Sequence, residues 1–340
     1  MSCVGRFGSS LSPRAVLRVS HTGGVEFVPA EAIAAIVARI EPLSRVVATS
    51  GLAGGLSSWM TTVEVERPDG SRHLLVIRRG RRPDAERHTL PFGVEFELLG
   101  HLAAHGIPVA RPRALDDSGR ILSQAFVVLD FVRGTTRFTT DDPVGMAIQM
   151  ADVLAAIHDL DATSASLPVL PLHADRMQGW VITDLIRREP DPSLREDLVR
   201  HHLDQHWPPP ATELCLLHGD YFPGNIVWDG DAIAAVIDWE SAALGDPMAD
   251  IATSRLDLRW AYGAEIAERF TDRYLTVTGR STATLAVWEL VVSLRPAGAV
   301  SLWANDMAAH GRPDISSDTM RSEQHAYVDS AIQRLNAASI

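Results

Sequence analysis

Lysine is absent from this chain of 340 residues, because all 31 of its Lys and Arg residues are arginine. The absence excludes several reaction classes. Schiff-base catalysis, attachment of pyridoxal phosphate and acyl transfer by a Ser-x-x-Lys motif all need a lysine amine, as does the phosphate loop G-x-x-x-x-G-K-S/T. Codon usage in a GC-rich genome explains such a bias. Any cation that the protein offers a ligand must still be a guanidinium, a protonated imidazole or a metal ion.

Cysteine is nearly as scarce, since the chain has Cys3 and Cys215 alone. Two cysteines are too few for a disulfide framework, so we expect a reducing, cytoplasmic compartment. No apolar run approaches the roughly 18 residues that a membrane span needs, so no membrane partner is expected. The formal net charge of −12 opposes a nucleic-acid partner, because phosphate binding needs basic surface. It is compatible with cationic substrates, and solubility explains it equally well.

The remaining composition is that of an ordinary globular protein, with 46% hydrophobic and 22% charged residues. The length suggests two domains or lobes. Residues 1–25 contain arginines and serines, and they lack the apolar core of a secretory signal. We expect a disordered tail there. A transit peptide, or a start codon placed upstream of the native one, is the alternative.

The N-terminal part of the chain has the pattern of a small β-rich lobe. Apolar periodicity and turn residues predict helices at 29–40 and 92–104, and strands at 45–50, 59–66, 72–79 and near 121–132. We place this lobe at residues 26–133, with a hinge to the next lobe at about 126–134.

Beyond the hinge, helical periodicity dominates. Helices are predicted at 195–206 and 260–276 among others, and short strands at 214–217 and 232–237. The sequence therefore predicts an α+β fold of two lobes, with a larger and mainly helical lobe over residues 134–340.

The strongest pattern in the chain is His218-Gly219-Asp220-x-x-x-x-Asn225, followed by an apolar strand that ends at Asp238. In the protein-kinase pattern, a catalytic Asp precedes a metal-binding Asn by five residues, and a second metal-binding Asp follows a short hairpin. One carboxylate deprotonates the attacking hydroxyl, while an amide oxygen and another carboxylate hold Mg²⁺ on the phosphates. The alternative is a strand–turn–strand in which Asp and Asn only cap the turns.

The segment from His218 to Asp250, which includes Leu244-Gly245-Asp246-Pro247, resembles the aminoglycoside phosphotransferase and choline kinase-like family of small-molecule kinases. The resemblance covers roughly residues 30–335 and is sharp only in this segment. It implies the bilobal protein-kinase-like fold. It also implies that His218 supports the backbone of the loop, and that Asp246 and Asp250 stabilise the loop structurally.

Specific roles follow from the same resemblance. It implies that Asp220 is the catalytic base and that Asn225 and Asp238 are the Mg²⁺ ligands. The acceptor site is then expected beside Asp220, between the helices of the second lobe. Asp257 is expected on the solvated surface by default, and the alternative is that it faces a polycationic ligand.

The resemblance also implies a nucleotide site in the first lobe. Gly54, Gly55, Ser57 and Ser58 lie between two predicted strands, where glycines let a loop approach phosphates closely. A generic hairpin loop is the alternative. Arg78 stands near the end of the third strand, where such a lobe normally presents a lysine to the α- and β-phosphates. A guanidinium can bind phosphate through two parallel N–H bonds. A solvated strand end is the other interpretation.

Glu95 is the expected partner of Arg78. It shares one helix face with three leucines, and a carboxylate on a packed face needs a cationic partner, whereas Glu97 points away. An unpaired surface Glu95 at the helix start is the alternative. The segment 125–134 resembles the hinge between the lobes, so adenine is expected to meet the backbone around Asp130 and Val132.

Together these patterns predict a Mg²⁺-dependent phosphotransferase that moves the γ-phosphate of ATP or GTP to a hydroxyl of a small molecule. A narrower alternative is an antibiotic phosphotransferase acting on a macrolide or an aminoglycoside. A nucleotide-binding pseudokinase scaffold and a metal-dependent phosphohydrolase are further alternatives. The sequence leaves the acceptor and the oligomeric state open.

Overall fold

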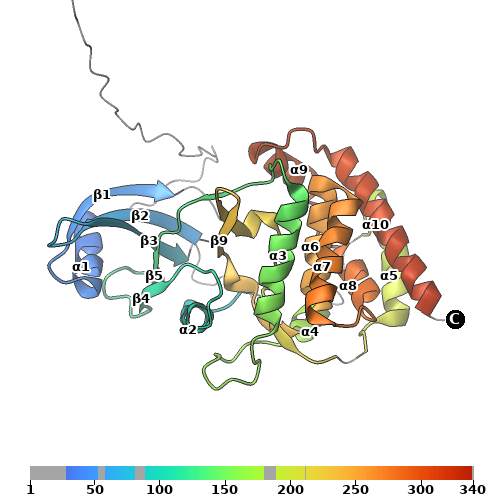
Figure 1. The fold of residues 1–340 in the computed structure, drawn as a ribbon, viewed down its shortest axis with the longest axis horizontal. Coiled ribbons are helices and arrows are strands. Elements are labelled where there is room, and N and C mark those ends of the chain that lie inside the picture. The colour runs from blue at the N-terminus through green and yellow to red at the C-terminus, as the bar shows by residue number, and fades with distance from the viewer. Residues whose placement is uncertain (1–27, 53–57, 81–88, 180–188, 211, 339–340) are drawn as a thin grey trace, which may run out of the picture.

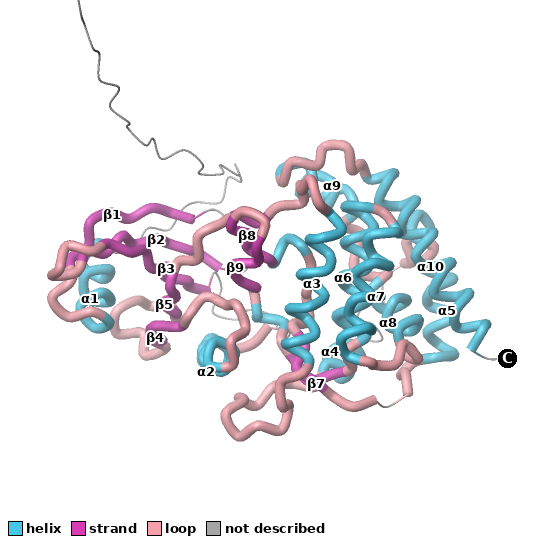
Figure 2. Tube along the Cα trace, in the orientation of Figure 1, coloured by secondary structure: helices cyan, strands magenta, loops and turns pink. Residues whose placement is uncertain are grey.

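The computed structural model describes residues 28–52, 58–80, 89–179, 189–210 and 212–338. They form two lobes that lie side by side along the long axis of the molecule (Figure 1). Strands dominate one lobe and helices the other, as Figure 2 shows. The predicted fold class is confirmed. The predicted tail at 1–25 lies outside the described residues.

The first lobe is a five-stranded antiparallel sheet with the order β1-β2-β3-β5-β4. Its strands are β1 (Arg45–Leu52), β2 (Ser58–Glu66), β3 (Arg72–Gly80), β4 (Pro112–Asp116) and β5 (Phe126–Asp130). Helix α1 (Ala30–Ile40) buries its apolar face against this sheet, and α2 (Phe92–Ala104) packs beside β4 and β5. The strand β3 is central, and its residues 75–79 are buried. Arg78 therefore stands in the middle of the sheet, opposite Met60 and Val127.

The second lobe is built around α6 (Met248–Tyr262), in which every residue from Met248 to Ala261 is buried. The other helices are α3 (Pro143–His158), α4 (His173–Met177), α5 (Glu196–His206), α7 (Ala264–Thr278), α8 (Leu285–Val292), α9 (Val300–Ala309) and α10 (Ser317–Ala338). Helix α7 packs against α3 and α6, while α8 and α10 pack against each other and against α6. None of the described helices is long and apolar enough to cross a membrane.

Short strands flank and interrupt the segment from His218 to Asp238. They are β6 (Thr135–Thr136), β7 (Cys215–Leu217), β8 (Ile226–Asp229), β9 (Ala232–Val236) and β10 (Ala243–Gly245). Strands β8 and β9 form an antiparallel hairpin, and β7 pairs with β10. The hairpin also contacts the first lobe, because the Val236 N–H donates to the Pro108 carbonyl at 2.7 Å.

Two predicted elements differ from the structure. The strand predicted near 121–132 begins only at Phe126, and the strand β4 was not predicted, because it is an edge strand that begins with Pro112. The helix predicted at 260–276 is two helices. Gly263 separates them with a φ of +87°, a conformation that L side chains rarely adopt.

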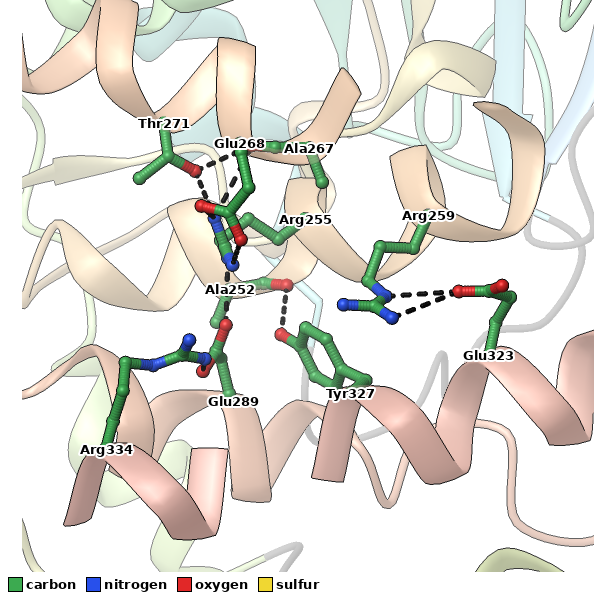
Figure 3. A network of polar contacts seen from close by, with 10 residues as sticks. All are labelled: Ala252, Arg255, Arg259, Ala267, Glu268, Thr271, Glu289, Glu323, Tyr327 and Arg334. Carbon is green, nitrogen blue, oxygen red and sulfur yellow. Dashed lines mark hydrogen bonds and ion pairs between the residues drawn. The ribbon is translucent and has the colours of Figure 1, made fainter. Parts of the chain in front are cut away.

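A buried ion network joins the helices of the second lobe (Figure 3). Arg255 on α6 is 1% exposed and donates to Glu289 on α8 at 2.8 Å and to Glu268 on α7 at 2.6 Å. Glu289, itself fully buried, also accepts from Arg334 on α10. Glu289 therefore links three helices through two guanidinium groups.

We expect Glu289→Gln to lower the free energy of unfolding by about 3 kcal/mol or more, because it leaves the buried Arg255 without a full counter-charge. Urea denaturation measures the change. The matched control is Glu265→Gln, which removes an exposed i,i+4 partner of Arg269 and should cost under about 0.5 kcal/mol. Equal losses in the two variants would contradict the central role of this network.

Candidate active site

The Asp250 carboxylate on α6 holds the backbone of the loop that follows β7. Its Oδ2 accepts a hydrogen bond from the His218 N–H at 2.8 Å, and its Oδ1 accepts one from the Gly219 N–H at 2.9 Å. The Nε2 of His158 lies 3.2 Å from the same Oδ2. Burial opposes the charge of Asp250, but the bonds from His158 and from the backbone keep the pKa of its carboxyl below the usual value. One buried carboxylate thus fixes the loop.

His218 joins the loop to the strand end that carries Asp238. Its Nε2 donates to the Ile237 carbonyl at 3.0 Å, and its Nδ1 accepts from the Asp220 N–H at 3.2 Å. An accepting Nδ1 requires a neutral imidazole with its proton on Nε2. Burial lowers the pKa of His218 and so favours this neutral form. Both nitrogens are occupied by the backbone, which fits a supporting role.

Gly219 is needed for the close packing of this loop. Its φ is +80°, and a Cβ at this position would collide with the carbonyl oxygen of Ser241. The backbone on the far side of the hairpin therefore lies directly against the residue before Asp220.

The Asp220 carboxylate is held at both oxygens. The Asn225 amide donates to its Oδ2 at 3.1 Å and to its backbone carbonyl at 2.9 Å. Arg295 donates to its Oδ1 at 2.5 Å and, with its other terminal nitrogen, to the Asp257 carboxylate at 3.2 Å. The Arg295 guanidinium also lies over the Trp303 ring, 5.5 Å from its centroid. The orientation of Asp220 is therefore fixed before any ligand binds.

Sequence reasoning missed Arg295 and misplaced Asp257. The expected surface position of Asp257 is wrong, since the residue is 5% exposed and burial raises its pKa to about 6. Arg295 lies 75 residues beyond Asp220, in a segment with no motif of its own. A contact of this range leaves no local pattern in one sequence.

Asn225 and Asp238 lie side by side, because the Ile237 N–H donates to the Asn225 carbonyl at 2.9 Å. The Asn225 NH₂ group is used by Asp220, which leaves its amide oxygen for a ligand. Burial, followed by the nearby Glu240 carboxylate, raises the pKa of Asp238 to about 7. An amide oxygen and a carboxylate whose negative charge is disfavoured by burial and by Glu240 form a donor set that suits a hard divalent cation.

The described residues alone do not supply a complete set of metal ligands. Within the described residues there is no group of three or more His, Cys, Asp or Glu side chains that could hold a metal ion. Mg²⁺ is commonly held by one or two carboxylates together with substrate phosphates. Asn225 and Asp238 fit that mode, in which the remaining ligands come from phosphate and water.

Arg78 stands at the centre of three carboxylates. It forms an ion pair with Glu95 on α2, lies 3.1 Å from Glu240 and 3.7 Å from Asp238, and donates to the Ser58 hydroxyl at 3.0 Å. Glu95 is 2% exposed, and its Oε2 has no partner within the described residues. Three carboxylates therefore share one guanidinium, and burial raises the pKa of Glu95 as it does that of Asp238.

A cavity of about 200 Å³ opens beside Arg78, between the sheet of the first lobe and the β8–β9 hairpin. All the described residues that were predicted to bind the nucleotide line it, together with Asp238: they are Ser58, Arg78, Glu95, Asp130 and Val132. Gly54, Gly55 and Ser57 lie outside the described residues. The apolar wall includes Val76, Leu129 and Trp239, which suits a flat heterocycle.

Backbone hydrogen bonds limit which N–H groups of the hinge segment could contact adenine. The Asp130 N–H donates to the Arg111 carbonyl at 2.9 Å, and the Phe131 N–H donates to the Leu74 carbonyl at 3.1 Å. Neither N–H is therefore open to adenine. Within the described part of the chain no hydrogen bond uses the Val132 N–H, so Val132 is the donor that this segment offers.

A second cavity, of about 300 Å³, opens beside the loop that carries Asp220. Asp220, Arg295 and Trp288 line it, together with His173 and Arg176 from α4. The Trp288 indole N–H donates to a carboxylate oxygen of Asp246 at 2.8 Å, which fixes the wall. Asp220 faces this cavity and Asp238 faces the first one. We name the second cavity the acceptor cavity.

We expect Asp250→Asn to lower the free energy of unfolding by about 2–3 kcal/mol, because an amide cannot accept hydrogen bonds at both positions and leaves one backbone N–H of the loop unpaired. Chemical denaturation measures this, with Asp231→Asn as the control. Asp231 is fully exposed and pairs only with Arg137 and Gln149 among the described residues. A loss for Asp250→Asn no larger than for the control would contradict the anchoring role.

Comparison with known proteins agrees with this geometry. The sequence model of the phosphotransferase enzyme family (APH) matches residues 49–288. Acyl-CoA dehydrogenase family member 11 of Mus musculus is 26% identical over 180 residues, which are 49% of this chain and 23% of that protein. A homoserine kinase of Afipia carboxidovorans is 28% identical over 159 residues, 44% of this chain and 46% of that one. The chain thus spans less than half the length of either relative.

The fold is shared with solved structures. The macrolide 2'-phosphotransferase MphH of Brachybacterium faecium superposes with a TM-score of 0.59 at 23% identity, covering 85% of this chain and 97% of that one. The family match includes the lining of the first cavity, the part of the second cavity up to Trp288, and the whole segment from His218 to Asp250. The resemblance carried by that segment is confirmed. The chain belongs to the phosphotransferase enzyme family.

Proposed function

We propose that this protein transfers the γ-phosphate of Mg²⁺-bound ATP or GTP to a hydroxyl group of a small molecule, with Asp220 as the catalytic base. Family membership supports the phosphotransferase chemistry. The observation that carries the proposal is the placement of Asp220 and Asp238 on neighbouring cavities. Their carboxylates are close enough for Asp220 to contribute to the raised pKa of Asp238.

The nucleotide fits the cavity of the first lobe. The base would lie among Val76, Leu129 and Trp239, and the Val132 N–H would meet its edge. The phosphates would extend toward Arg78, whose planar guanidinium can bind two phosphate oxygens at once. Mg²⁺, held by Asn225 and Asp238 when bound, supplies neutralisation of the charge on the phosphates.

Asp220 would act on the acceptor hydroxyl. Arg295 and Asn225 each bind one of its oxygens, so the carboxylate is held in one orientation with lone pairs left for a proton. The hydroxyl oxygen forms a bond to the γ-phosphorus while the bond to the β–γ bridging oxygen breaks. The hydroxyl proton moves to Asp220, and the nucleoside diphosphate leaves. Positioning and charge neutralisation account for the catalysis, with no covalent enzyme intermediate.

We expect Asp220→Asn to lower the rate of acceptor-dependent ADP release by about 10²–10⁴-fold, because the amide cannot take the hydroxyl proton. A coupled assay over hydroxylated metabolites and antibiotics measures the rate, and calorimetry with ADP and Mg²⁺ checks that nucleotide affinity stays within about twofold. Asp229→Asn, at the exposed end of β8, is the control. Unchanged turnover in Asp220→Asn would remove Asp220 from the mechanism.

We expect Arg78→Ala to weaken the binding of Mg²⁺–ATP by tenfold or more, because the phosphates lose their cation and Glu95 loses its partner. Arg78→Lys should fall between this variant and the native protein, since an ammonium keeps the charge and loses the planar fork. Arg72→Ala at the exposed start of β3 is the control. Native affinity in Arg78→Ala would show that the nucleotide binds elsewhere.

The same acceptor screen separates the alternatives. Phosphorylation of a macrolide or an aminoglycoside, with resistance in a sensitive host, would establish the antibiotic function. Nucleotide binding without transfer to any acceptor would favour the scaffold. Turnover of phosphoesters without nucleotide would favour the phosphohydrolase.

A further inference from the structure

One arginine that lines the acceptor cavity has no carboxylate contact among the described residues. Among the described residues, the charged groups that line it are Arg176, Arg295 and Asp220. Arg295 donates to Asp220 and to the buried Asp257, and these carboxylates offset its charge. Arg176 has no carboxylate partner in the described ranges. The cavity therefore presents, beside Asp220, one guanidinium that only carbonyl groups of the described residues contact.

Two carbonyl groups hold Arg176 next to the catalytic loop. Its Nη1 donates to the Ser241 carbonyl at 2.5 Å, and its Nη2 lies 3.5 Å from the Ala242 carbonyl. The Ser241 oxygen in turn lies directly against Gly219, the residue before Asp220. A guanidinium has five N–H donors, so donors remain for a ligand. Arg176 and Asp220 line the same cavity, so one small ligand could contact both side chains.

His173 supplies a second polar group to the same wall, one helical turn before Arg176. Its Nδ1 is buried and has no hydrogen-bond partner among the described residues. Its ring packs against Trp288 with the centroids 5.1 Å apart. Burial lowers the pKa of His173 to about 4, so the imidazole is neutral near pH 7 and adds no charge. A buried polar atom without a partner is costly, and an oxygen of a bound ligand would satisfy it.

The rest of the lining is apolar and limits the size of the ligand. Met177, Trp288, Val291 and Val292 form this part of the wall. The volume of about 300 Å³ is at the lower end of the range for ligand pockets. The cavity therefore suits a small molecule with a short aliphatic body and one anionic end.

We propose that the acceptor is a small hydroxy acid, whose carboxylate or other anionic group binds Arg176 while its hydroxyl meets Asp220. The proposal rests on the phosphotransferase function proposed above and narrows its substrate class. It opposes a polycationic acceptor, because an ammonium group at the same position would meet the Arg176 guanidinium. The transferred phosphoryl group is the other anion within reach of this cavity, and the experiment separates the two.

The test is ADP release from ATP by the full chain with a series of candidate acceptors. The matched series is 3- and 4-hydroxybutanoate, their neutral methyl esters and the corresponding cationic amino alcohols. Longer hydroxy acids, neutral polyols and aminoglycosides extend the panel. We expect the hydroxy acids to be turned over at least tenfold better, by kcat/KM, than their neutral or cationic counterparts. For the best acceptor, Arg176→Met should raise KM at least tenfold with kcat changed less than threefold. Arg176→Lys should recover part of the loss.

Two controls keep the result interpretable. Arg269→Met removes an exposed arginine of α7 that pairs only with Glu265 among the described residues and should change neither constant. The affinity for ADP with Mg²⁺ should be native in Arg176→Met, which also shows that the variant is folded.

Three outcomes would overturn the proposal. Preference for neutral or cationic acceptors would overturn it and leave the phosphotransferase function intact. Loss of ATP affinity in Arg176→Met, with KM for the acceptor unchanged, would place the arginine on the nucleotide phosphates. Failure of every acceptor class, with ADP still bound, would reject the transfer function itself.

Discussion

The ion cluster around Arg78 is the interaction on which both lobes depend. A protein without lysine has only arginine as a permanent side-chain cation, and this one stands on the central strand of the sheet. It contacts Glu95 from its own lobe, and Asp238 and Glu240 from the hairpin side of the second lobe. The planar guanidinium presents its Nη1 to Glu95 and its Nη2 to both Asp238 and Glu240. The same contacts that join the lobes also shape the cavity beside Arg78.

The loop that carries Asp220 is connected to this cluster through the backbone. Asp238 follows Ile237, whose carbonyl accepts from His218 and whose N–H donates to Asn225. His218 in turn accepts from the Asp220 N–H, and Asp250 holds the start of the loop. Each of these hydrogen bonds has a buried partner, which is His218, Asn225 or Asp250. The Asp220 carboxylate and the candidate metal ligands are therefore positioned by the fold before a ligand enters.

The sequence predicts the parts of this site that are local. Spacing alone relates Asp220 to Asn225, and the helix period selects Glu95 over Glu97 as the partner of Arg78. It cannot predict Arg295 and Arg176, which reach Asp220 and Ser241 over 75 and 65 residues. These contacts depend on how α4 and the segment after α8 pack against the loop. The break at Gly263 was missed for a related reason, because the helical period continues on both sides of it.

The placement of Asp238 beside Arg78 and Asn225 gives the most direct test of this account. Calorimetric titration of the full chain with ATP, over a series of free Mg²⁺ concentrations, measures whether the nucleotide and the metal bind together. The account predicts that saturating Mg²⁺ tightens nucleotide binding at least tenfold in the native protein, and less than twofold when Asp238 is replaced by Asn. Nucleotide affinity that does not depend on Mg²⁺ in the native protein would contradict it.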